Sequence, residues 1–304
     1  MKNAAICVLC AAALVTCVRP GAAQSASARD PHAGHAMEQA ALAAGTGQVG
    51  AANLPPAEEN AKVRLNASPR HGEYADIALP GGGGALRAWV SYPERKDKAP
   101  VVIVIHEIFG LTDWIRSVAD QLAADGYIAI APDLLTGKGP NGGGTDAFAS
   151  RDDVVAGVRG LAADEVLTRL NTVRDYATKL PAANGKTATV GYCWGGSTSF
   201  AYATMQPGLN AAVVFYGSAP SELSTLAGIR APVLGLYGEN DARVNATIDG
   251  AKAEMAKLGK VFEPHIFPGA GHGFLRAQSG QAGANLKATQ QAWPTMLAFF
   301  KKHL

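Results

Sequence analysis

Cys193 stands in the stretch of the chain with the clearest potential for chemistry, residues 187–200, which read T-A-T-V-G-Y-C-W-G-G-S-T-S-F. Residues 187–190 are β-branched and apolar and predict a buried strand, whereas residues 198–205 predict a helix. Between them, glycines flank the cysteine in the order G-x-C-x-G, which is typical of a tight turn that presents a nucleophile. The positive end of the following helix would favour a thiolate and an oxyanion. The alternative is a glycine-rich turn around a buried, inert cysteine.

A catalytic thiol needs a base, and the base needs a group that orients it. Two predicted strands downstream of Cys193 end in polar loops, G-E-N-D with Asp241 and G-A-G-H-G-F with His272. In an α/β-hydrolase sheet the nucleophile, the acid and the histidine follow one another in this order. We therefore expect His272 to be the base and Asp241 its orienting partner, although each could instead be an ordinary turn residue.

An acyl-transfer site also needs two backbone N–H groups for the oxyanion. The N–H of Trp194 directly follows the nucleophile and is the first candidate. The second is the N–H of Ile108, in the loop after the predicted strand 100–105. Glu107 lies in the same loop, where it is either a solvated charge or a group that contacts the thiol.

Strands and helices alternate along the chain from residue 72 onward, and this alternation positions the candidate residues. The expected strands are 74–79 and 86–92, joined as a hairpin, then 100–105, 127–131, 187–190, 211–216, 232–237 and 261–267. The expected helices are 113–125, 163–180, 198–205, 248–258 and about 285–304, with a glycine-rich loop over 136–147. The pattern predicts an α/β fold with a mostly parallel central sheet and helices on both faces.

Six short motifs resemble those of the dienelactone hydrolase family. They are H-E-I-F-G (106–110), A-P-D-L (131–134), G-Y-C-W-G-G (191–196), F-Y-G (215–217), G-E-N-D (238–241) and H-G-F-L-R (272–276). The resemblance covers about residues 71–304. It implies an α/β-hydrolase fold, a triad of Cys193, Asp241 and His272, and cleavage of an ester or lactone with no metal or organic cofactor.

The same resemblance implies roles for three charged residues. Glu107 would hold the resting thiol and exchange protons as the thiolate forms. Arg276 would bind a carboxylate of the substrate, and Arg151 is the best match to the family's second carboxylate-binding arginine. Each arginine could otherwise be an exposed surface charge. We therefore expect a small-molecule ester or lactone that carries a carboxylate and is cleaved through a cysteine acyl-enzyme.

The N-terminal residues are typical of an exported protein. Residues 1–23 combine Lys2, an apolar stretch and a small-residue cleavage site, as in a secretory signal peptide. Residues 24–69 are rich in Ala, Gly, Ser and Pro and lack apolar periodicity, so we expect a flexible arm there. Residues 70–304 would form the hydrolase domain of a periplasmic or secreted protein.

Cleavage after residue 23 would leave a nearly neutral chain. It removes Lys2 and Arg19, so Lys+Arg falls from 27 to 25, against 25 for Asp+Glu. This balance argues against nucleic acid and anionic membranes as partners, and we expect a monomer. The cleavage also removes every cysteine except Cys193, which then has no disulfide partner in its own chain.

Two other classes of function stay open. One is a hydrolase-fold protein that binds a small acid without turnover, which a complete triad disfavours. The other is a periplasmic copper-handling or thiol redox protein based on His32, His35, Met37 and Cys193. The short spacing of the three arm residues and the single cysteine of the mature chain disfavour it.

Overall fold

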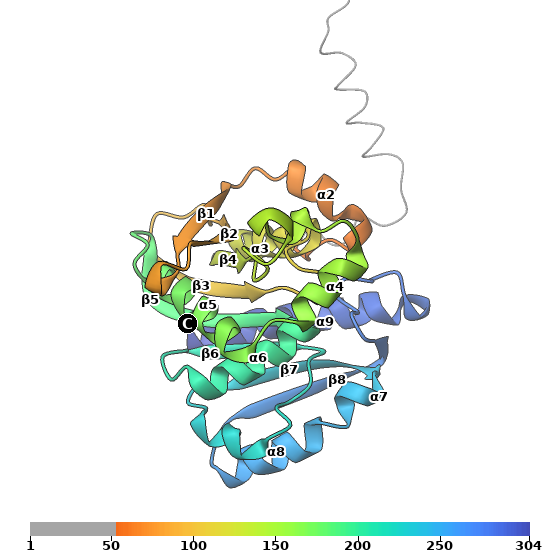
Figure 1. Ribbon diagram of the computed structural model, residues 1–304. Helices are drawn as coiled ribbons and strands as arrows, with labels where there is room; N and C mark the ends of the chain where they lie inside the picture. The colour runs from red at the N-terminus through yellow and green to blue at the C-terminus, as the bar shows by residue number, and fades with distance from the viewer. Residues whose placement is uncertain (1–52) are drawn as a thin grey trace, which may run out of the picture. The chain divides into compact units, whose positions relative to one another are not determined.

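An eight-stranded sheet runs through the computed structural model, which describes residues 53–304 (Figure 1). The strand order is β1-β2-β4-β3-β5-β6-β7-β8. The pairs β1–β2 and β2–β4 are antiparallel, and all other neighbours are parallel. The strands are β1 (Gly72–Ala78), β2 (Ala85–Ser91), β3 (Ala99–Ile105), β4 (Ile128–Pro132), β5 (Ala183–Tyr192), β6 (Ala211–Phe215), β7 (Val233–Asn240) and β8 (Phe262–Gly271). The mostly parallel sheet confirms the expected fold class.

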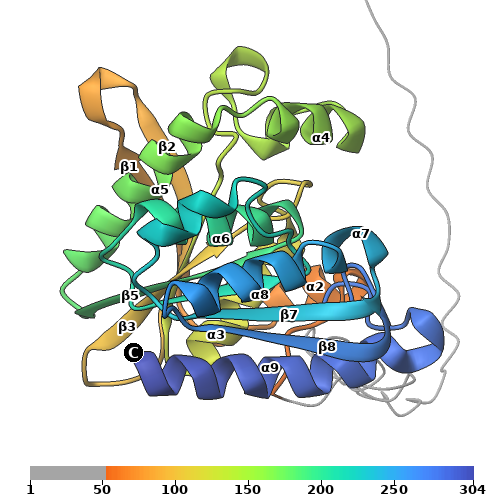
Figure 2. The same cartoon turned by 90° about the horizontal axis from the view of Figure 1, so that it is seen from below.

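Helices cover both faces of this sheet (Figure 2). The described α-helices are α2 (Glu58–Asn66), α3 (Asp113–Ala124), α4 (Arg151–Arg159), α5 (Ala163–Thr178), α6 (Trp194–Met205), α7 (Ala242–Asn245), α8 (Ile248–Lys257) and α9 (Ala284–His303). Helices α5, α6 and α8 pack on one face, and α3 and α9 on the other. Strand β3 is buried throughout, and its side chains alternate between the two apolar clusters, with Ile103 in one and Val102 in the other.

The turn at Cys193 depends on the absence of a side chain at Gly195. Strand β5 ends at Tyr192, and α6 begins directly after the cysteine. A Cβ atom on Gly195 would lie 2.3 Å from the carbonyl oxygens of Ile105 and His106. Only glycine therefore allows the first turn of α6 to pack against the end of β3.

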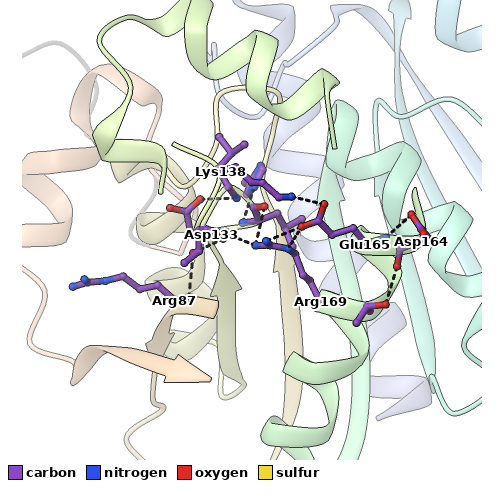
Figure 3. Close-up of polar contacts among 11 residues, drawn as sticks. Arg87, Asp133, Lys138, Asp164, Glu165 and Arg169 are labelled. Carbon is purple, nitrogen blue, oxygen red and sulfur yellow. Dashed lines mark hydrogen bonds and ion pairs between the residues drawn. The ribbon is translucent and has the colours of Figure 1, made fainter. Parts of the chain in front are cut away.

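Polar contacts hold the glycine-rich segment that leads to α4 (Figure 3). The N–H and the hydroxyl group of Thr145 both donate to the Asp133 carboxylate at 2.7 Å. Arg169 donates to the carbonyl oxygen of Thr136 at 2.8 Å. The segment contains the 3₁₀ turns η2 (Pro140–Gly142) and η3 (Thr145–Ala147). These contacts hold the segment before α4, whose first residue is Arg151.

Residues 53–69 belong to the folded domain, so the flexible arm expected over 24–69 is wrong for this part. Leu54 and Ala61 are buried in the apolar cluster that also contains α3. Trp114 donates from Nε1 to the carbonyl oxygen of Pro56 at 3.0 Å. Helix α2 has too few apolar residues for an amphipathic pattern, and the stability of such helices comes mainly from tertiary contacts.

The rest of the expected arm and the expected signal peptide lie outside the described residues, as do His32, His35 and Met37. Within residues 53–304 no helix has the length and the apolar composition that a membrane span requires.

Candidate active site

Four loops that bear candidate residues follow neighbouring parallel strands at the same edge of the sheet. Glu107 lies just after β3, Cys193 after β5, Asp241 after β7 and His272 after β8. Strands β3, β5, β6, β7 and β8 are adjacent in this order and parallel. Ligands of open α/β sheets bind at this carboxyl edge, so the fold collects the candidate residues where a site is expected.

Cys193 has a strained backbone conformation with φ 56° and ψ −115°. Its N–H donates to the carbonyl oxygen of Phe215 at 3.0 Å, and its own carbonyl accepts from the N–H of Ser197 at 3.1 Å. These bonds hold a conformation that costs a non-glycine residue about 1–3 kcal/mol. The cysteine is partly exposed and forms no disulfide with the described residues.

His272 and Asp241 form a close pair. The Nδ1 atom of His272 lies 2.6 Å from Oδ2 of the buried Asp241. Burial lowers the pKa of His272, but the hydrogen bonds with Asp241 and Cys193 outweigh it and raise this pKa to about 9. The structure therefore brings Cys193, His272 and Asp241 together in the arrangement of nucleophile, base and orienting acid.

The two expected oxyanion donors lie in two different loops at the carboxyl edge of the sheet. Trp194 is the first residue of α6, and Ile108 lies in the loop after β3. Neither N–H donates to a backbone acceptor elsewhere in residues 53–304. The buried His106 ring fixes this loop: it stacks on Trp194 with 5.5 Å between ring centroids, and its Nδ1 lies 2.7 Å from the carbonyl oxygen of Glu107.

Glu107 forms an ion pair with Arg276. Its Oε2 lies 2.8 Å from Nε of Arg276, although the Nε–H is not directed at it, so the contact is an ion pair rather than a hydrogen bond. Glu107 is 3% exposed, and burial raises its pKa to about 7 although Arg276 and His272 oppose this rise. No side-chain hydrogen bond joins Glu107 to Cys193 among the described residues, and the expected role of Glu107 in holding the thiol stays a prediction.

The two expected arginines meet beside the same aromatic ring. The guanidinium carbon of Arg151 lies 3.6 Å from the centre of the Phe109 ring, and that of Arg276 lies 5.3 Å from it. Both arginines also form ion pairs with Glu58 at the start of α2. The structure thus brings them together, already in contact with a carboxylate of the chain.

Two buried tyrosines complete the wall of the site, and sequence reasoning did not assign them a role. The hydroxyl groups of Tyr192 and Tyr216 have no hydrogen-bond partner among the described residues. Burial and the charge of Glu107 raise the pKa of both well above the ordinary value. The Tyr216 ring also packs edge-on against His272 at 5.2 Å. Tyr216 lies within the F-Y-G motif, and this motif could have indicated that the tyrosine belongs to the site.

The described part of the chain contains no group of three His, Cys, Asp or Glu side chains that could hold a metal ion. The arrangement supplies a sulfur nucleophile, a proton acceptor next to it and N–H donors for a developing oxyanion. These are the parts that acyl transfer requires.

Comparison with known proteins places the chain in a family. The family model described as "Dienelactone hydrolase family" matches residues 86–304. A Salmonella typhimurium protein named "Putative carboxymethylenebutenolidase" is 31% identical over 241 residues, which cover 74% of this chain and 86% of the relative. A crystal structure titled "Putative Dienelactone Hydrolase", from Klebsiella pneumoniae, is 27% identical with a TM-score of 0.66, and the match covers 76% of this chain and 99% of that one. The chain is therefore a hydrolase with the α/β-hydrolase fold and belongs to the dienelactone hydrolase family.

Proposed function

We propose that this protein is an exported enzyme that hydrolyses a carboxylic ester or lactone through a thioester on Cys193. The observation that carries the proposal is the strained turn at Cys193, with φ 56°, in contact with a histidine whose Nδ1 lies 2.6 Å from Asp241. Strain is maintained at functional sites when the surrounding structure over-determines it. Family membership supports the same type of reaction.

The reaction has two halves. His272 accepts the thiol proton, and the thiolate of Cys193 attacks the substrate carbonyl carbon, forming a C–S bond. The N–H groups of Trp194 and Ile108 stabilise the oxyanion. As the carbonyl re-forms, the C–O bond breaks and His272 returns the proton to the leaving oxygen. Water then attacks the thioester while His272 takes its proton, the acid is released and the thiol is restored.

The substrate class follows from the two arginines. A guanidinium binds a carboxylate as a planar fork, with strong charge-assisted hydrogen bonds. Arg276 and Arg151 lie beside Phe109 in the same wall as Glu107. We propose that they receive a carboxylate next to the ester or lactone bond of the substrate. The further role of Glu107 in exchanging protons with the thiol stays a prediction.

Intact-mass measurement after incubation with activated esters and lactones tests the thioester. We expect the wild type to gain the mass of one acyl group and to release product. Cys193→Ala should lose both with an unchanged melting temperature, and Cys193→Ser should be a poor enzyme, since the site is arranged for a thiolate. Turnover by Cys193→Ala would refute the nucleophile assignment. Binding without adduct or product in the wild type would favour a non-catalytic binding protein.

Export is a separate part of the proposal, supported by the signal-like composition of residues 1–23. N-terminal sequencing of the protein from a periplasmic fraction should find Gln24 as the first residue. A retained Met1, or a lipid on Cys17, would contradict it.

A further inference from the structure

Glu58 bridges the two arginines of the site with a single carboxylate. Its Oε1 lies 3.3 Å from Nη2 of Arg151, and its Oε2 accepts a short hydrogen bond from Nη1 of Arg276. The residue is the first of helix α2 and lies before residues 86–304, which match the family model. The bridge therefore comes from a segment outside the region that the family model matches.

The backbone around Glu58 is held in place by three hydrogen bonds. The N–H of Glu58 donates to the carbonyl oxygen of Arg276 at 3.0 Å. Just before it, Pro55 accepts from Gln278 Nε2 at 2.9 Å, and Pro56 accepts from Trp114 Nε1 at 3.0 Å. The Glu58 carboxylate is thus positioned by the fold, so its contact with the arginines costs little additional ordering.

The charges of this cluster balance without a substrate. Arg151 and Arg276 carry two positive charges, and Glu58 and Glu107 can carry two negative ones. An incoming carboxylate must either displace Glu58 or join the cluster as an excess negative charge. The charge of Glu58 also reaches deep into the site, since it contributes to the raised pKa of Glu107.

Exposure shows that the bridge can be displaced. The side chain of Glu58 is 36% exposed and that of Arg151 is 54% exposed, whereas that of Arg276 is 21% exposed. Ion pairs between solvent-exposed groups are weak. A ligand can therefore exchange with Glu58, and Glu58 acts as a competitor rather than as a permanent block.

We propose that Glu58 is a specificity-determining residue, which occupies Arg151 and Arg276 in place of a substrate carboxylate and so disfavours anionic substrates relative to neutral ones. The inference rests on the proposed function for its substrate class. It assigns to helix α2 a role in the choice of substrate. The structural basis is direct contact of one carboxylate with both guanidinium groups.

The first test compares Glu58→Gln with the wild type on two esters that differ only in a carboxylate. We expect kcat/KM for the anionic ester to rise about threefold to fivefold, mainly through KM, because a weak, partly exposed ion pair no longer competes with the substrate carboxylate. The neutral ester should change less than twofold. Glu58→Asp, which keeps the charge, should stay near the wild type.

Glu59→Gln is the matched control, since it removes the same charge from the same turn of α2. Glu59 is exposed and forms no ion pair with described residues. It should leave both substrates unchanged. An equal change on both substrates in Glu58→Gln, or no change on either, would overturn the inference.

A second readout does not depend on turnover. Iodoacetate and iodoacetamide each form a C–S bond with the thiolate of Cys193 and release iodide, and they differ by one carboxylate. Glu58→Gln should raise the ratio of the iodoacetate rate to the iodoacetamide rate about threefold to fivefold, and Glu59→Gln should not. A raised ratio without any ester turnover would reject the hydrolase proposal and retain the role of Glu58. Turnover with an unchanged ratio would reject the role of Glu58 alone.

Discussion

Replacement of Asp241 by asparagine should change the pH range in which the enzyme works. The pKa of His272 is raised from 6.5 to about 9 although burial lowers it, and Asp241 makes the largest of the raising contributions. We expect Asp241→Asn to lower this pKa by at least about one pH unit. Above its pKa the histidine has lost the proton that the leaving oxygen needs. The wild-type kcat/KM for a neutral ester should therefore fall as the pH rises above about 9. In the variant the same fall should begin at a lower pH.

Two measurements check this reasoning. The first is the pH profile of kcat/KM between pH 5 and 10. We expect the variant to keep about 10⁻⁴ of the wild-type activity, as is typical when such an acid is replaced by its amide. The second is an NMR titration of the His272 ring, which reports the pKa directly. Asp249→Asn is the control, because it removes a carboxylate from the exposed first turn of α8. An unchanged His272 pKa in Asp241→Asn would refute the assignment.

The same pKa has a consequence for stability. A histidine whose pKa is higher in the folded protein contributes stability that is complete below its unfolded pKa, near 6.5. This contribution is lost as the pH rises through about 9. The free energy of unfolding should therefore decline over this range in the wild type, and less so in Asp241→Asn.

Three further predictions follow from the site and from helix α2. Burial raises the pKa of Glu107 from 4.5 to about 7, so the free energy of unfolding of the wild type should fall by about 3 kcal/mol as the pH rises from 4.5 to 7. Glu107→Gln should abolish this fall, as measured by urea unfolding at several pH values. Deletion of residues 53–69 should lower the melting temperature by roughly 5–10 °C, because it exposes the partners of Leu54 and Ala61; an unchanged melting temperature would restore the idea of a free arm. Arg276→Ala should lower kcat/KM for an anionic ester about ten- to a hundredfold and leave a neutral ester nearly unchanged, whereas equal losses would indicate a structural role.

Sequence alone was sufficient for the parts of this protein that depend on local pattern. Continuous apolar runs predicted strands such as β3, because a strand buried on both faces has no polar side to alternate with. The order of Cys193, Asp241 and His272 along the chain, each at a strand end, predicted their meeting, because parallel strands bring their carboxyl ends to one edge. Gly195 marked the tight turn, since a side chain there would collide with the end of β3.

Only the tertiary structure decided which charges meet. Glu58 contacts Arg151, 93 residues away in the sequence, and Arg276, 218 residues away. Local periodicity cannot predict such a pairing. Helix α2 was missed because its stretch lacks an apolar stripe, and its stability comes from Trp114, Gln278 and the cluster they adjoin. The pairing of Glu107 with Arg276 depends in the same way on loops that follow different strands. Periodicity reports what a segment buries, whereas ion pairs and pKa values depend on neighbours that the fold supplies.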